Sequence, residues 1–132
     1  MHYDPYQDPD PEEWLELDEH ERIDLVKRYH RKKRIKIPNL NVHASLHTIV
    51  ETQIAMGDQT PARKTLKRLM DEGLDRHQAV HAIATTITDL LYDLRSGKKI
   101  DDPNAYCAEK LEKLTAESWL HYWDNDDTTD DA

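Results

Sequence analysis

Two pairs of histidines have the spacing that places ligands on one face of a helix. His43 and His47 are four residues apart, and so are His77 and His81. Residues i and i+4 lie one turn apart on the same side of an α-helix. Two imidazoles in that arrangement can hold one ion, as they do in helical zinc sites. The spacing therefore predicts metal binding.

The segments that contain the two pairs resemble each other. When His43 is aligned with His77, Leu40 falls on Leu74, and both segments follow the pattern Leu-x-x-His-x-x-(Leu/Val)-His-x-Ile. Either an internal duplication or convergent use of one helix pattern explains this similarity. In each segment the histidines border the apolar stripe of the expected helix, so we expect them to face the interior or its edge.

Three helices are expected to position these histidines. One begins at Asn39 or Asn41 and ends at Met56, the second lies between Thr60 and Gly73, and the third runs from Asp75 to about Arg95. Short loops join them, which favours antiparallel neighbours and makes the first and third helices parallel. Four imidazoles would then lie in one layer, a four-histidine set that suits Zn²⁺, with Fe or Ni as alternative divalent ions.

A carboxylate follows the first pair at the same spacing. Glu51 lies four residues after His47, where it can act as a fifth ligand or hydrogen-bond His47. If one coordination position is open to water, Glu51 becomes the candidate base for metal-assisted hydrolysis. Glu72 and Asp75, near the next turn, are further carboxylate candidates. No other catalytic pattern is present, so the sequence predicts metal binding without a defined reaction.

Two other interpretations use the same histidines. They can form a structural polar layer in a non-enzymatic protein-interaction module. Alternatively, if they are protonated, their position near helix N-termini can hold an anion. The helix dipole opposes a cation there by about 0.3–1 kcal/mol. Metal–imidazole bonding in a structural site reaches ~10 kcal/mol, so the dipole does not rule a metal out. Two pairs in matched frames favour metal binding over the other two interpretations.

The segment 42–93 resembles a group of uncharacterised bacterial helical proteins that share a domain of unknown function. Their pattern is His-x-x-x-His, a Glu four residues later, a Gln two further on, and a second His-x-x-x-His on a later helix. The matching residues here are His43, His47, Glu51, Gln53, His77 and His81. The resemblance implies a helical fold and a role for these six positions, but it implies no activity.

Composition indicates the fold class. The chain has 132 residues, of which 34% are charged and only 3 are glycine, and no segment alternates with the period of a strand. We predict an all-α protein, a small helical bundle of four to five helices with disordered acidic ends. The expected parts are a flexible acidic arm at 1–10, a single domain at 11–123 and a disordered acidic tail at 124–132. Further helices are expected at 11–17, at 19–33 and from Asp102 to about Tyr122.

Charge and cysteine content limit the possible partners and compartments. The formal net charge of −9 repels nucleic-acid backbones, although seven basic residues lie between Lys27 and Lys36. The single cysteine, Cys107, cannot form an internal disulfide. The sequence begins without a signal peptide and contains no membrane-spanning stretch, so a cytoplasmic location is expected. Aromatic residues near the C-terminal end leave a homo-oligomer or a protein partner open.

Overall fold

All regular secondary structure is helical in the part of the chain that the structure describes. A computed structural model describes the backbone of residues 1–124 and the side chains as far as His121. Its elements are α1 (Pro11–Glu16), α2 (Glu19–Lys32), α3 (Leu40–Ala55), the short 3₁₀ helix η1 (Gly57–Gln59), α4 (Ala62–Asp71), α5 (Arg76–Arg95), α6 (Pro103–Lys113) and α7 (Ala116–Asp124). The predicted all-α class is confirmed, whereas the predicted number of four to five helices is too low.

Polar side chains cap the starts of the principal helices. Asp18 and Asp75 each form a capping box, with Glu21 and Gln78 respectively, and the Asn39 side chain caps α3. A side-chain cap of this kind contributes about 1 kcal/mol. These caps fix the starting positions of α3 and α5, and therefore the positions of the histidines that the two helices carry.

The single helix predicted from Asp102 to about Tyr122 is instead two helices. Leu114 has an extended backbone, and the Thr115 hydroxyl caps α7 by accepting from the Ser118 amide at 3.0 Å. The Glu72 carboxylate also accepts from the Ala116 amide at 2.8 Å. Short polar side chains that bond to nearby backbone compete with helix continuation. This competition, together with a carboxylate from a distant helix, ends α6 and starts α7.

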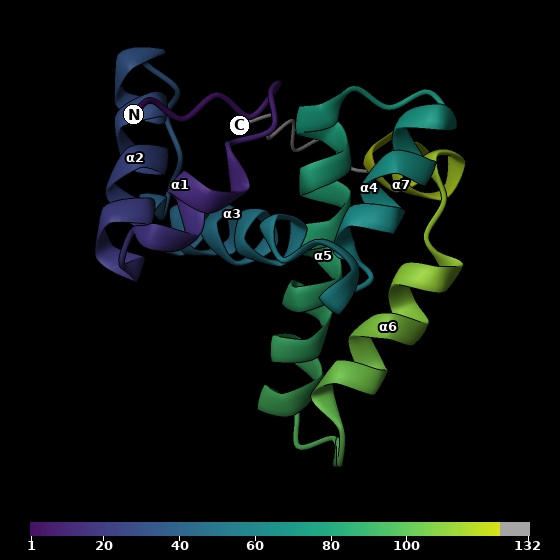
Figure 1. Ribbon diagram of the computed structural model, residues 1–132. Coiled ribbons are helices and arrows are strands. Elements are labelled where there is room, and N and C mark those ends of the chain that lie inside the picture. Colours follow the sequence, from purple (N-terminus) through teal and green to yellow (C-terminus); the bar gives the residue numbers. More distant parts are fainter. Residues whose placement is uncertain (125–132) are drawn as a thin grey trace.

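The prediction that the two histidine-bearing helices are parallel is wrong. Helix α3 lies across α5 at a steep angle (Figure 1). A short loop brings two helix ends together but does not fix the angle between their axes, and α4 has only 10 residues with which to set it. Two helices that cross touch only near the crossing point. The histidines of α3 and α5 can therefore meet there without being parallel.

Two hydrophobic clusters flank this crossing. The larger one joins α3 to α7 and includes Val50, Leu69, Ile83 and Trp119. The smaller one surrounds Trp14 and brings α1 and α2 against α3. Together they hold the three helices α2, α3 and α5 around a region that is polar and largely buried.

The structure describes the N-terminal segment fully and the C-terminal segment only in part. Residues 1–10, predicted as a flexible arm, contain two buried residues, Tyr3 and Pro5. The predicted tail at 124–132 lies outside the described residues except for Asp124, which ends α7. No helix among the described residues is long and apolar enough to cross a membrane.

Candidate metal centre

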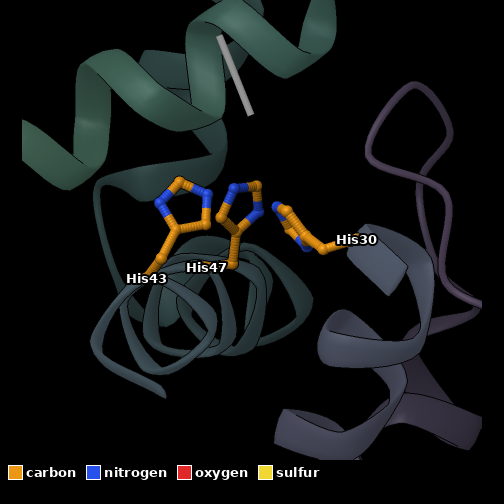
Figure 2. Close-up of side chains that lie close together, drawn as sticks. All are labelled: His30, His43 and His47. Carbon is orange, nitrogen blue, oxygen red and sulfur yellow. The ribbon is translucent and has the colours of Figure 1, made fainter. Parts of the chain in front are cut away.

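Five histidines from three helices converge where α2, α3 and α5 meet. The contributors are His30 from α2, His43 and His47 from α3, and His77 and His81 from α5. They form two groups of three: the first contains His30, His43 and His47, and the second contains His47, His77 and His81. Within each group the possible ligand atoms lie within 4.8 Å of one another. Figure 2 shows the His30 ring reaching from α2 toward the adjacent rings of His43 and His47 on α3.

The four histidines predicted from the sequence are brought together by the fold. Ring centroids are 4.7 Å apart for His43 and His47, 4.5 Å for His77 and His81, and 5.3 Å for His43 and His81. The Nε2 atoms of His47 and His81 are 3.0 Å apart. In a tetrahedral zinc site with bonds of about 2.0–2.1 Å, ligand nitrogens lie ~3.3 Å apart. The His47–His81 pair is therefore close to ligand spacing already.

His47 lies at the centre of this cluster, in surroundings that favour the neutral imidazole. It is buried, and burial lowers the pKa of its imidazole well below the ordinary value. The nearby histidines, His81 first among them, lower that pKa further. A metal ligand must be the neutral imidazole, so the environment of His47 keeps it in the form that binds a cation.

Sequence reasoning did not include His30 in the site, because it has no histidine at the i+4 spacing. Its position on the apolar face of α2 was the only signal. In the structure it is fully buried, and its Nδ1 lies 2.8 Å from the Val26 carbonyl oxygen. A carbonyl can only accept, so Nδ1 carries a proton and donates it to Val26.

A tyrosine in the N-terminal segment determines which ring nitrogen of His47 carries the hydrogen. The Tyr3 hydroxyl donates to Glu51 Oε2 at 2.5 Å and lies 3.0 Å from His47 Nδ1. A hydroxyl has one hydrogen, so toward His47 the Tyr3 oxygen accepts and Nδ1 is the donor. The lone pair of His47 is then on Nε2, the nitrogen that lies beside His81.

Glu51 is held by an arginine rather than directed at the histidines. Arg76 donates through Nη1 and Nη2 to the two oxygens of Glu51, at 2.9 and 2.7 Å. Its Nε also donates to Asp8 at 2.8 Å, and Nη1 donates to the Pro5 carbonyl. Glu51 belongs to neither group of possible ligands. Its carboxylate therefore anchors Tyr3 and Arg76, and Tyr3 links it to His47.

The other predicted carboxylates have local structural roles. Glu72 pairs with Arg68 at 2.7 Å and caps α7, and the Ala116 amide and Arg68 lower the pKa of its carboxyl group. Asp75 caps α5. Neither belongs to a group of possible metal ligands among the described residues.

Sequence reasoning also missed Tyr3 and Arg76. A buried carboxylate requires a partner, so the position of Glu51 on the buried side of its helix signalled that a cation was needed. That signal did not identify Arg76, which precedes the second histidine pair by one residue. Nothing in the Asp- and Pro-rich segment around Tyr3 distinguishes this tyrosine from Tyr6.

The chain belongs to the family described as Domain of unknown function (DUF1841), whose family model matches residues 8–112. The match extends well beyond the segment 42–93 on which the resemblance rested, and it includes all five clustered histidines. No curated protein and no solved structure matches the chain. The description of the family assigns no activity, so the function has to be argued from the site.

Proposed function

We propose that this protein, a member of a family without an assigned activity, binds a single divalent transition-metal ion through its histidine cluster. The observation that supports this is the convergence of five imidazoles from three helices, each group of three within 4.8 Å. One such imidazole at a core edge is commonly a packed, hydrogen-bonded side chain. Five together, with His47 at their centre in surroundings that favour the neutral imidazole, form a donor set that suits a cation.

His47, His77 and His81 hold the ion in this proposal, and the fourth tetrahedral position is available to His43 or to a ligand from solution. Three or four imidazoles match the tetrahedral coordination of Zn²⁺, so zinc is the proposed ion, with iron or nickel as alternatives. His47 belongs to both groups but has only Nε2 to offer, because Nδ1 bonds Tyr3. The two groups are therefore alternative positions for one ion rather than sites for two.

Tyr3, Glu51 and Arg76 orient the central ligand in this proposal. Metal-bound histidines commonly donate their other ring nitrogen to an oxygen, which fixes the ring and its tautomer. Here Tyr3 is that acceptor, Glu51 holds the Tyr3 hydroxyl, and Arg76 holds Glu51. Of the two roles predicted for Glu51, we propose the outer one, acting through Tyr3. Hydrolysis at the metal would then need a base other than Glu51, so no reaction is proposed.

The anion-binding alternative is less well supported by the site. It requires protonated imidazoles, whereas the pKa of His47 is lowered by burial and by its histidine neighbours. The remaining alternative is a structural histidine layer in a protein-interaction module. That alternative predicts no bound metal and no effect of chelators on stability.

The test is metal analysis of protein purified without a His tag. Wild type is expected to contain, or to take up, about one equivalent of zinc, and the His43→Ala/His81→Ala double variant is expected to lose it. Both substituted residues are only partly buried. The matched control is His20→Ala, an exposed histidine on α2 outside the cluster, which should retain the metal. No stoichiometric metal in wild type, or equal metal in the double variant, would overturn the proposal.

A further inference from the structure

A pocket of about 360 Å³ lies directly against the histidine cluster. Three of the five clustered histidines line it: His43, His47 and His81. This volume is within the range of about 300–1,000 Å³ that is typical of small-molecule sites. A molecule in this pocket would therefore contact the proposed ion or its ligands.

The pocket extends along one face of α5. His81, Thr85 and Asp89 all line it and follow one another at intervals of one helical turn. At a rise of 1.5 Å per residue, the distance along the helix from His81 to Asp89 is about 12 Å. The pocket is thus long enough for an extended small molecule, with the histidines at one end and Asp89 at the other.

The middle of the pocket is mainly apolar. Leu46 from α3, Ala84 from α5, Leu114 at the end of α6 and Trp119 from α7 line it. The broken helix contributes to this wall, since the bend at Leu114 precedes the turn of α7 that carries Trp119. An aromatic or aliphatic group in the middle of a bound molecule would be removed from water by these side chains.

The hydroxyl groups that line the pocket are acceptors. Thr85 donates its hydrogen to the Ala82 carbonyl at 2.6 Å, and Thr88 donates to the Ala84 carbonyl at 3.2 Å. Ser118, on the opposite side, donates to the Thr115 carbonyl at 2.9 Å. A hydroxyl has one hydrogen, so these three groups can only accept from a ligand.

The carboxylate of Asp89 adds a negative charge at the end far from the histidines. It is about half exposed, and its ion pair with Lys110 is long at 3.8 Å. An exposed pair of that kind contributes little, so a bound cation can compete with Lys110. The far end of the pocket therefore favours a protonated amine over a neutral or anionic group.

We propose that this pocket binds an elongated small molecule with a metal-ligating group at one end, an apolar middle and a protonated amine at the other end. The inference rests on the proposed function for its metal-ligating end. The apolar walls and the acceptors around Asp89 define the rest of the ligand class independently of the ion.

The test uses three probes on the full chain loaded with Co²⁺, whose visible absorption reports the ligands. The probes are imidazole, 4-phenylimidazole and 4-(4-aminomethylphenyl)imidazole. The phenyl group is expected to tighten binding about 10-fold through burial. The aminomethyl group is expected to tighten it by a further factor of about 2 to 5, the range of an exposed ion pair.

Two variants assign each gain to its part of the pocket. Thr85→Phe fills the middle and should remove the gain from the phenyl group, and Asp89→Asn should remove the gain from the aminomethyl group. Asp71→Asn, an exposed carboxylate of α4 that does not line the pocket, is the matched control and should keep both gains. Equal affinity for all three probes would overturn the proposed ligand class of the pocket, while the proposal of metal binding would stand.

Cobalt spectra recorded without a probe separate the two proposals. If no cobalt bands form, the proposed function has failed. The pocket is then tested by adding the aminomethyl probe to metal-free ¹⁵N-labelled protein. Amide shifts concentrated at residues 84–89 and 114–119 would support the apolar and amine ends of the pocket, and no shifts there would overturn them.

Discussion

Two tyrosine–carboxylate hydrogen bonds of nearly equal length lie in different surroundings. Tyr3 donates to Glu51 at 2.5 Å in the buried region beside the histidines, and Tyr106 donates to Asp93 at 2.6 Å near the end of α5. The Glu51 side chain is 0% exposed, whereas the Asp93 side chain is 26% exposed. The same chemical pair is therefore present in the interior and in contact with water.

The neighbours of the two carboxylates show what burial requires. Asp93 has water on one side and a distant lysine, Lys98, at 3.6 Å. Glu51 has lost its water and has both oxygens bonded by Arg76 and Tyr3. A buried charge is tolerated only when its hydrogen bonds are complete. The Tyr106–Asp93 pair, which is partly exposed and which we call the exposed pair, fastens α6 to α5. The buried pair positions an acceptor for His47.

The causes of the raised tyrosine pKa values differ in the same way. Burial raises the pKa of Tyr3 well above its ordinary value, and the charge of Glu51 raises it further. For Tyr106 the hydrogen bond to Asp93 is the largest cause, and it raises the pKa to about 12. Removing one partner should therefore have a large effect on the buried pair and a local effect on the exposed pair.

The largest effect is expected from Arg76→Leu. This change leaves Glu51 as a buried carboxylate without its cation, which costs about 3–5 kcal/mol in comparable pairs. Urea denaturation of the metal-free protein measures the loss in free energy of unfolding. Lys98→Leu, next to the exposed carboxylate, is the control and should change little.

A second variant distinguishes the loss of the Arg76 charge from a purely steric effect of the substitution. The double change Arg76→Leu/Glu51→Leu removes both charges and should recover much of the stability, because no unpaired charge remains buried. Equal stabilities of the Arg76→Leu and Lys98→Leu proteins would mean that the two regions do not differ as described.

The next largest effect is expected from Tyr3→Phe, measured as zinc affinity. The aromatic ring is kept, but His47 Nδ1 loses its oxygen acceptor and the ring is no longer fixed. Loss of such an outer partner typically lowers metal affinity 10- to 100-fold. Competition with a chromophoric chelator measures this change. Tyr106→Phe removes the equivalent hydroxyl from the exposed pair and should leave zinc affinity unchanged; a loss there as large as in Tyr3→Phe would contradict the assigned role.

The sequence predicted the parts of the site that are periodic along the chain. The i, i+4 histidines and the helix caps depend on local geometry. The structure has Asp75 capping α5 as predicted, and Asn39, one of the two predicted starts, capping α3. His30 and Arg76 could not be predicted in the same way, because their roles depend on how α2 and α5 approach α3. That approach is set by hydrophobic packing between residues distant in sequence.

The structure of the N-terminal segment is even harder to predict from local sequence patterns. Its composition of Asp, Pro and Tyr is typical of disorder, and local patterns carry no further information. Tyr3 is buried because its ring packs near Trp14 and Tyr29 and its hydroxyl reaches Glu51 and His47. Those partners are spread over α1, α2 and α3, so the contact exists only once the three helices are assembled.

A smaller effect is expected from Asp8→Ala, which removes the exposed member of the Arg76 network. Asp8 is 67% exposed and bonds Arg76 at 2.8 Å. Exposed ion pairs contribute about 0–1 kcal/mol, so the variant should lose no more than this and should keep its zinc affinity. Thermal unfolding and chelator competition on the same samples measure both. A loss as large as in Arg76→Leu would show that the N-terminal segment is held by its exposed charge rather than by Tyr3.

The smallest and most local effect is expected for the exposed pair itself. The pKa of Tyr106 is raised to about 12 by its hydrogen bond to Asp93. Because the pKa is raised in the folded state, the stability contributed by this group is fully present below its unfolded pKa of about 10 and is lost as the pH rises toward 12. Asp93→Asn should return the pKa of Tyr106 toward 10 and remove this dependence.

The measurement is the ultraviolet titration of phenolate absorption. Subtracting the titration curve of the Tyr106→Phe protein isolates Tyr106 from the other five of the six tyrosines. Tyr3 provides the contrast within the same spectra, because burial is the first cause of its raised pKa. Its ionisation should remain suppressed in Asp93→Asn while that of Tyr106 moves. If Tyr106 did not respond to Asp93→Asn, the exposed hydrogen bond would not be the cause of its raised pKa, and burial would have to account for both tyrosines.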